Sequence, residues 1–197
     1  MKQFFQISLT TYIVSILMLS VWHDVTFHII KDVHPGALFH IAFAISLIFF
    51  CFFKYKAIPA LYSAQLTTYF FTYEDLATLL PQEVIFSFFN ISAALSFISI
   101  ILTVRLLKWV RVNNFKLSLI EPLKFNNYRY IILVIIISSL FLSILVHTIV
   151  PYLYPDFSPD VLYVFIYFFG AVLSCFSILA VLVIIFKTLI FSKLIRK

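Results

Sequence analysis

The sequence predicts an all-α protein, a polytopic bundle of six transmembrane helices with both the N- and C-termini in the cytoplasm. The 197 residues are 63% hydrophobic and 11% charged and include only 2 glycines, a composition with too little polar surface for a water-soluble domain. The apolar residues fall in six runs, each near the roughly 20 residues that cross about 30 Å of hydrocarbon as a helix. Opposite charges also separate between alternate loops, as in oriented membrane proteins.

The six apolar runs justify the six predicted helices in turn. Together they make residues 1–197 a single transmembrane domain, and none shows the alternation typical of barrel strands. The first run has no small-x-small cleavage pattern after it, so we expect it to be retained as a helix rather than removed as a signal peptide. The predicted helices cover about residues 4–22, 35–53, 57–73, 84–104, 130–150 and 162–186.

The charged residues predict the orientation. All Lys and Arg except Lys31 fall in the N-terminus, the short turn with Lys54 and Lys56, the loop 105–129 and the tail. All Asp and Glu except Glu121 fall in the other three connections. Cytoplasmic loops retain cations, so the sequence predicts a multi-pass protein of the bacterial inner membrane. Because these cations sit in short loops between apolar runs, the net charge of +6 does not indicate nucleic-acid binding.

The loop 105–129 carries a predicted lipid interface. Arg105, Lys108 and Arg111 recur every three residues beside Trp109, which puts the cations along one side of a helical extension. We expect this extension to lie on anionic lipid at the cytoplasmic face and to end before Pro122. The alternative is topology-setting charge whose aliphatic stems snorkel along the bilayer.

All five histidines lie in or just beneath the predicted outer segments. Asp24 and His28 share one helix face with Asp32 if that stretch is helical. His40 is predicted about 7 Å inside the second helix and His147 about 6 Å inside the fifth. Ionisable groups at that depth favour a functional site. The candidate residues for ligand or proton sensing are therefore His28, His34, His40, His147, Asp24 and Asp32.

Several uses of these groups stay open at the level of sequence, and the cofactor is unknown. His34, His40 and His147 are candidate ligands of a divalent transition metal. Histidines beside carboxylates also suit a proton sensor. His40 and His147 at matched depth permit a b-type haem. Alternatively, they are interfacial polar residues that only bond to their neighbours. No phosphate-binding loop, nucleophile elbow or paired-cysteine motif occurs, so we do not expect an enzyme.

Small residues recur at a spacing of four in three of the predicted helices. Such pairs let helix backbones approach closely, and we expect them at packing interfaces inside the bundle. The pairs are Ala60 and Ala64, Ser92 and Ser96, and Ala171 and Cys175.

One stretch resembles a known family. His34-Pro35-Gly36-Ala37, an apolar helix and then Phe53-Lys54-Tyr55-Lys56-Ala57-Ile58-Pro59-Ala60 are similar to the helix, basic turn and proline-led next helix of bacterial membrane-associated sensor (MASE-type) domains. Those domains precede cyclic-dinucleotide enzymes and histidine kinases. Phe168-Phe169-Gly170-Ala171-Val172-Leu173 resembles the last helix of that family. This chain departs in having six rather than about eight helices, no acidic residue after Gly170 and no output domain. The resemblance implies a sensor that signals through a separate partner protein.

A second resemblance rests on size and topology alone. Six helices in under 200 residues with both ends inside are also similar to the substrate-binding membrane subunits of vitamin transporters, which depend on partner subunits. We therefore expect a non-catalytic sensory or ligand-binding membrane module that acts through a partner. The alternatives are a transporter subunit and a b-type haem membrane subunit.

Overall fold

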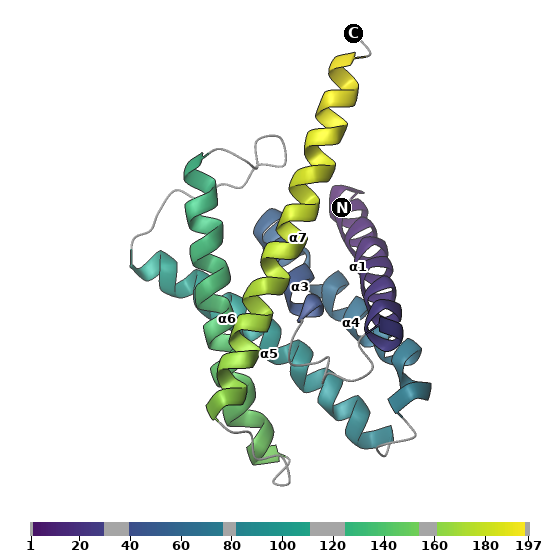
Figure 1. Cartoon of the computed structure of the whole chain (residues 1–197), viewed down its shortest axis with the longest axis vertical. Coiled ribbons are helices and arrows are strands. Elements are labelled where there is room, and N and C mark those ends of the chain that lie inside the picture. Colours follow the sequence, from purple (N-terminus) through teal and green to yellow (C-terminus); the bar gives the residue numbers. More distant parts are fainter. Residues whose placement is uncertain (1, 30–39, 77–81, 111–124, 154–160, 196–197) are drawn as a thin grey trace.

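A computed structural model describes residues 2–29, 40–76, 82–110, 125–153 and 161–195 of the chain (Figure 1). Within these ranges the protein has six α-helices and one 3-10 turn and contains no strand, which confirms the all-α prediction. The elements are α1 (Lys2–Ile29), α3 (Ile41–Phe53), η1 (Lys54–Lys56), α4 (Ile58–Leu76), α5 (Gln82–Trp109), α6 (Phe125–Leu153) and α7 (Val161–Ile195).

Three of the described helices are long and apolar enough to cross a membrane. The spans are Asn90–Trp109 in α5, Arg129–Tyr152 in α6 and Val161–Ile184 in α7, and they match the predicted crossings 84–104, 130–150 and 162–186. The apolar part of α1, Ser8–Ser20, is shorter than a full span. Three candidate spans indicate a membrane protein.

Two helices continue beyond the apolar runs from which they were predicted. Helix α5 continues to Trp109, where a helical extension was expected, and α6 begins at Phe125. The last apolar run was predicted to end at residue 186, and α7 continues to Ile195, with its end projecting beyond the other helices (Figure 1). Hydropathy marks where a helix meets lipid, whereas the backbone hydrogen bonds of a helix can continue through polar residues in water.

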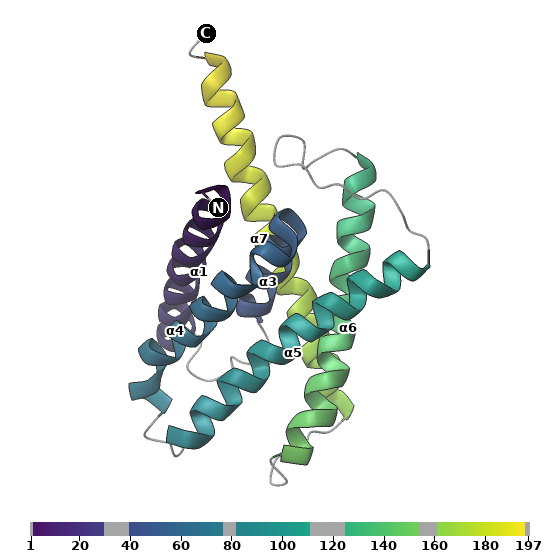
Figure 2. The same cartoon turned by 180° about the vertical axis from the view of Figure 1, so that it is seen from behind.

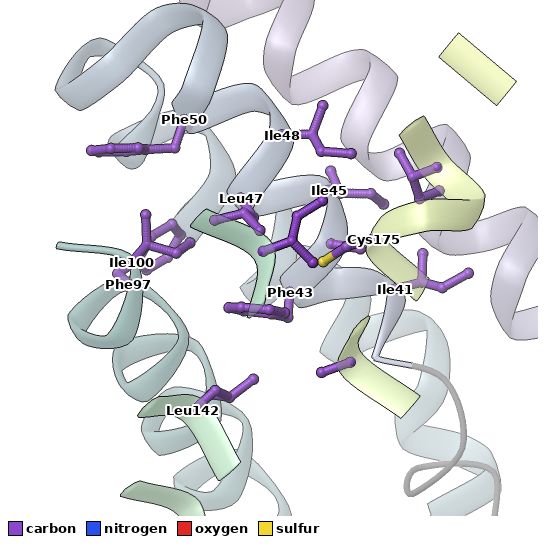
Figure 3. Close-up of a cluster of buried hydrophobic side chains, with 14 of the residues drawn as sticks. Ile41, Phe43, Ile45, Leu47, Ile48, Phe50, Phe97, Ile100, Leu142 and Cys175 are labelled. Atoms are coloured by element: carbon purple, nitrogen blue, oxygen red, sulfur yellow. The ribbon is translucent and has the colours of Figure 1, made fainter. Parts of the chain in front are cut away.

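The short helix α3 lies at the centre of the bundle. Its 13 residues read IAFAISLIFFCFF, and eight of them are buried against α1, α4, α5 and α7. Figure 3 shows Phe43, Ile45 and Leu47 of α3 among Ile100 of α5 and Cys175 of α7. A helix that is apolar all round is stable only where protein or lipid covers it, and here neighbouring helices do so. The structure describes the predicted helix 35–53 only from His40 onwards.

Three hydrogen bonds between side chains tie α4 to its neighbours. They run from Gln65 Nε2 to Ser46 Oγ of α3 (2.7 Å), from Tyr62 OH to Asn90 Oδ1 of α5 (2.8 Å), and between Tyr12 OH of α1 and Thr67 Oγ1 (3.0 Å). Figure 2 shows α4 between α1 and α5. Polar contacts of this kind fix the rotation of apolar helices about their axes, because apolar packing alone is tolerant of small rotations.

The predicted small-residue pairs lie at packing interfaces. Ala60, Ala64, Ser96, Ala171 and Cys175 are buried, and Ser92 is half-buried. This confirms that the pairs serve packing inside the bundle.

The outer surface of the bundle is strongly apolar. Exposed large side chains line the outward faces of α1, α6 and α7. Such continuous apolar surface is rare on soluble monomers and is the surface that lipid contacts in membrane proteins. The exposed residues include Phe5, Leu9, Ile13 and Leu17 on α1, Ile132, Ile136, Leu140 and Ile144 on α6, and Phe165, Phe169 and Leu173 on α7.

Candidate functional site

Two of the predicted histidines contact one tyrosine at the end of the bundle where α6 leads into α7. His40 directly precedes α3. His147 lies six residues before the end of α6, and Tyr167 lies six residues after the start of α7. Each is therefore about 9 Å along its helix from the α6–α7 connection. Helices α6 and α7 are antiparallel (Figure 1) and in contact, so His147 and Tyr167 lie at the same level.

Both imidazoles pack on one tyrosine ring. The ring centroids of His40 and Tyr167 are 4.4 Å apart, and those of His147 and Tyr167 are 5.3 Å apart with the rings nearly perpendicular. Tyr163, one turn before Tyr167, lies 6.1 Å from His147 in the same measure. We call His40, His147, Tyr163 and Tyr167 the histidine–tyrosine cluster. Tilted and edge-to-face pairs of this kind contribute about 0.5–1.5 kcal/mol each beyond their buried area.

One hydrogen bond fixes the tautomer of His147. Its Nδ1 lies 2.7 Å from the carbonyl oxygen of Ser143, one turn earlier on α6. A carbonyl oxygen only accepts, so Nδ1 carries the proton and, in the neutral ring, Nε2 is left as the acceptor. Nε2 is buried and has no hydrogen-bond partner among the described residues. His147 therefore presents one buried basic nitrogen with unused bonding capacity.

Ser143 joins the cluster to the packing of α6 on α7. Its hydroxyl donates to the carbonyl oxygen of Val164 at 2.7 Å. Val164 follows Tyr163 directly and lies three residues before Tyr167 on α7. The hydrogen bond therefore holds the two tyrosines at the level of His147. A change at His147 is thus coupled to α7 both through ring contacts and through Ser143.

The predicted site is only partly covered by the described residues. His40 and His147 both contact the ring of Tyr167. Asp24 and His28 lie one turn apart in the helical backbone of α1, and the structure describes nothing of their side chains. His34 and Asp32 lie outside the described residues, so the three-histidine metal set stays a prediction. Among the described side chains, no three His, Cys, Asp or Glu gather closely enough to hold a metal ion.

The position of Tyr167 bears on the haem alternative. A b-type haem held by His40 and His147 would need its macrocycle to lie between the two imidazoles. The ring of Tyr167 contacts both of them. It would have to leave that position for a porphyrin to enter, so the arrangement does not fit a bis-histidine haem.

Sequence reasoning missed Tyr163, Tyr167 and Ser143. The available signal was distance from the connection: Tyr163 and Tyr167 are one turn apart, and residues equally far from a helix–helix connection lie level with each other. Five aromatic residues lie between positions 161 and 170, and their number alone does not tell which ring faces inward. In the structure Tyr167 is buried, whereas Phe165 and Phe169 are exposed.

The predicted lipid interface lies largely within α5. Arg105, Lys108 and Trp109 belong to its last turns and are exposed, with 82% of Trp109 accessible. Arg111 lies outside the described residues. The cations therefore stand on a direct continuation of an apolar span, and their contact with anionic lipid stays a prediction.

No protein-family model matches this chain, and neither does any curated protein or any solved structure. The resemblances noted from the sequence thus remain expectations. The case for function rests on the histidine–tyrosine cluster.

Proposed function

We propose that this chain is a non-catalytic sensory module of the bacterial inner membrane, which takes up one proton at the histidine–tyrosine cluster and acts through a partner protein. The observation that carries the proposal is the convergence of His40 and His147 on Tyr167, with the Nε2 of His147 buried and unpaired among the described residues. Histidine is the side chain whose charge changes near neutral pH, so it suits such an input.

The proposal includes six crossings with both termini in the cytoplasm. The segregation of charge supports it, and so does Figure 1, where α1 begins and α7 ends toward the same end of the bundle. Lys54 and Lys56 are exposed in η1, as expected of a cytoplasmic turn. In this orientation the histidine–tyrosine cluster lies near the outer face, and the projecting end of α7 lies in the cytoplasm.

Protonation would change what the cluster can bind. When Nε2 of His147 accepts a proton, it turns from an acceptor into a donor and the ring becomes positive. The rings of Tyr163 and Tyr167 pack against His147, and His40 packs against the same Tyr167 ring. A positive charge on His147 would disfavour protonation of His40, so we expect the cluster to take up one proton.

Helix α7 is the element that would carry the signal. It contacts both α3 and α6 and bears two rings of the cluster near its start. The whole helix has 35 residues, about 52 Å, and extends toward the opposite end of the protein. A shift of α7 at the cluster would therefore reach the cytoplasmic side, where a partner could read it. The resemblance to sensor domains likewise implies that this chain detects the signal and that a separate partner protein responds to it.

The test is a distance measurement across the bundle. Spin labels at the exposed residues Tyr55 in η1 and Val181 in α7 would be placed in a background with Cys51→Ala and Cys175→Ala. In lipid nanodiscs, we expect the label distance distribution to change between about pH 7.5 and about pH 5, the range in which histidine titrates.

The control variants separate the cluster from general effects of acid. His147→Gln should remove the change, whereas Thr148→Val, one residue on and exposed, should keep it. A distribution that does not respond to pH in the parent protein, or an equal response in His147→Gln, would refute the proposed input.

A further inference from the structure

Residues 185–195 continue helix α7 beyond the length that a membrane requires. The apolar span Val161–Ile184 has 24 residues, about 36 Å of helix, and so exceeds about 30 Å of hydrocarbon by itself. Helix α7 continues to Ile195, about 16 Å farther, and Figures 1 and 2 show this end projecting beyond the other helices. We call residues 185–195 the α7 extension. Because the span begins directly after Asp160, the α7 extension lies outside the hydrocarbon.

The α7 extension combines apolar residues with positive charge. Its apolar residues are Ile185, Phe186, Leu189, Ile190, Phe191, Leu194 and Ile195. By helical register they fall on every side of the helix. Its charged residues, Lys187 and Lys193, are both basic, and no Asp or Glu occurs in residues 161–197. A helix that is apolar on every side needs a cover of protein or lipid, so the α7 extension calls for an occupant.

The bilayer is a poor cover for the α7 extension. A helix that binds the membrane surface lies in the plane of the interface. Helix α7 is one continuous helix and has neither glycine nor proline after Gly170, so nothing in its sequence bends it into that plane. The α7 extension therefore follows the axis of its own span and leads away from the lipid.

A second copy of this chain is also a poor cover. Two copies inserted in the same orientation would bring their α7 extensions together in parallel, with each lysine level with the same lysine of the other copy. Such basic segments repel each other, and no carboxylate in residues 161–197 offsets the repulsion. A protein of opposite charge matches the α7 extension better.

We propose that the α7 extension is the element that binds the partner protein, which receives it in an apolar groove rimmed by Asp and Glu side chains. This inference rests on the proposed function for the existence of a partner and for its cytoplasmic side. An apolar helix laid into an apolar groove is a common mode of recognition, in which residues three and four apart on the helix fill the groove. Carboxylates at the rim attract Lys187 and Lys193 and steer the approach.

Photo-cross-linking in cells tests the proposal on the whole chain. Ile190, in the middle of the α7 extension, is replaced by the photoreactive p-benzoylphenylalanine. In the matched control the same replacement is made at Ile144, an exposed residue on the apolar face of α6. We expect the Ile190 position to form an adduct with a cytoplasmic protein, and mass spectrometry to locate the attachment beside Asp and Glu residues of that protein. The Ile144 position should not form this adduct.

Charge variants show whether the basic residues direct the binding. Lys187→Glu with Lys193→Glu should lower the adduct yield at least about tenfold, because like charges that face each other across an interface repel. Lys187→Arg with Lys193→Arg keeps the charge and should keep the yield. Lys187→Gln with Lys193→Gln removes the charge without reversing it and should give an intermediate yield. The amount of membrane-inserted protein is measured for each variant and normalises the yields.

Other adducts would overturn the proposal. An adduct between two copies of this chain would identify the second copy as the occupant, and an adduct with lipid alone, or none, would show that no partner binds there. A yield that is equal in the Glu and Arg pairs would show that the groove is not acidic. Cross-linking is done at one pH, and the spin-label test of the cluster needs no partner, so the docking element and the proton input can fail independently.

Discussion

Single polar side chains decide how the apolar helices of this protein fit together. Gln65 is buried in α4 and donates to Ser46 Oγ at 2.7 Å and to the carbonyl oxygen of Ala42 at 3.3 Å. Ser46 donates in turn to the same carbonyl. The three groups form a closed network in which the amide protons of Gln65 have acceptors on α3. The network positions α4 against the central helix.

Gln65→Leu keeps most of the side-chain volume and removes these donors. We expect it to lower the free energy of unfolding by about 1 kcal/mol, the usual scale of an interhelical hydrogen bond in membrane proteins. Unfolding in mixed detergent measures the change. Ser63→Ala is the matched control on the same helix, since its exposed hydroxyl bonds only to Pro59 of its own helix. A loss no larger than that of the control would show that the network does not stabilise the bundle.

The residue scale also shows how far sequence reasoning reached. The matched depths of His40 and His147 were predictable, because depth follows from the rise of 1.5 Å per residue. Their common partner Tyr167 was not, because Tyr167 is one of several aromatic residues at the start of α7. Which of them faces inward depends on the rotation of α7, and that is fixed by contacts with α3 and α6.

At the scale of elements, the tight turn between α3 and α4 carries local strain. Lys54 ends α3 with φ 55° and ψ −143°, the only positive φ at a non-glycine residue among those described. This region is disfavoured for any residue with a Cβ and costs of order 1 kcal/mol or more. The turn is kept because η1 must reverse the chain within three residues before α4 begins.

Lys54→Gly should therefore raise the free energy of unfolding by about 1 kcal/mol. Lys56→Gly is the matched control: it removes the same charge from the same turn at a residue without positive φ, and flexible glycine should destabilise it slightly. Chemical denaturation of both variants gives the comparison. The strain account fails if Lys54→Gly is no more stable than Lys56→Gly.

Helix existence was easier to predict than helix length. The apolar runs located α5, α6 and α7, whose spans are both long and apolar enough to cross a membrane. The spacing of Arg105 and Lys108 predicted the helical extension at the end of α5, whereas the extension at the end of α7 was not predicted, because hydropathy does not report backbone hydrogen bonding in water. The central burial of α3 was also beyond sequence, since a continuous apolar run looks the same whether lipid or protein covers it.

For the whole molecule, the account depends on the two ends of the bundle lying on opposite sides of the membrane. The basic turn η1 would lie in the cytoplasm and the histidine–tyrosine cluster near the outer face. Two exposed tyrosines mark these ends: Tyr55 in η1 is 55% exposed, and Tyr152 near the end of α6 is 86% exposed. Neither belongs to the cluster.

Labelling these two positions in intact cells is the most direct test. In the Cys51→Ala, Cys175→Ala background, with the outer membrane made permeable, a membrane-impermeant maleimide should label Tyr152→Cys. It should label Tyr55→Cys only after the inner membrane is opened. Labelling of Tyr55→Cys from outside, or protection of Tyr152→Cys until the inner membrane is opened, would contradict the orientation and the outward-facing site with it.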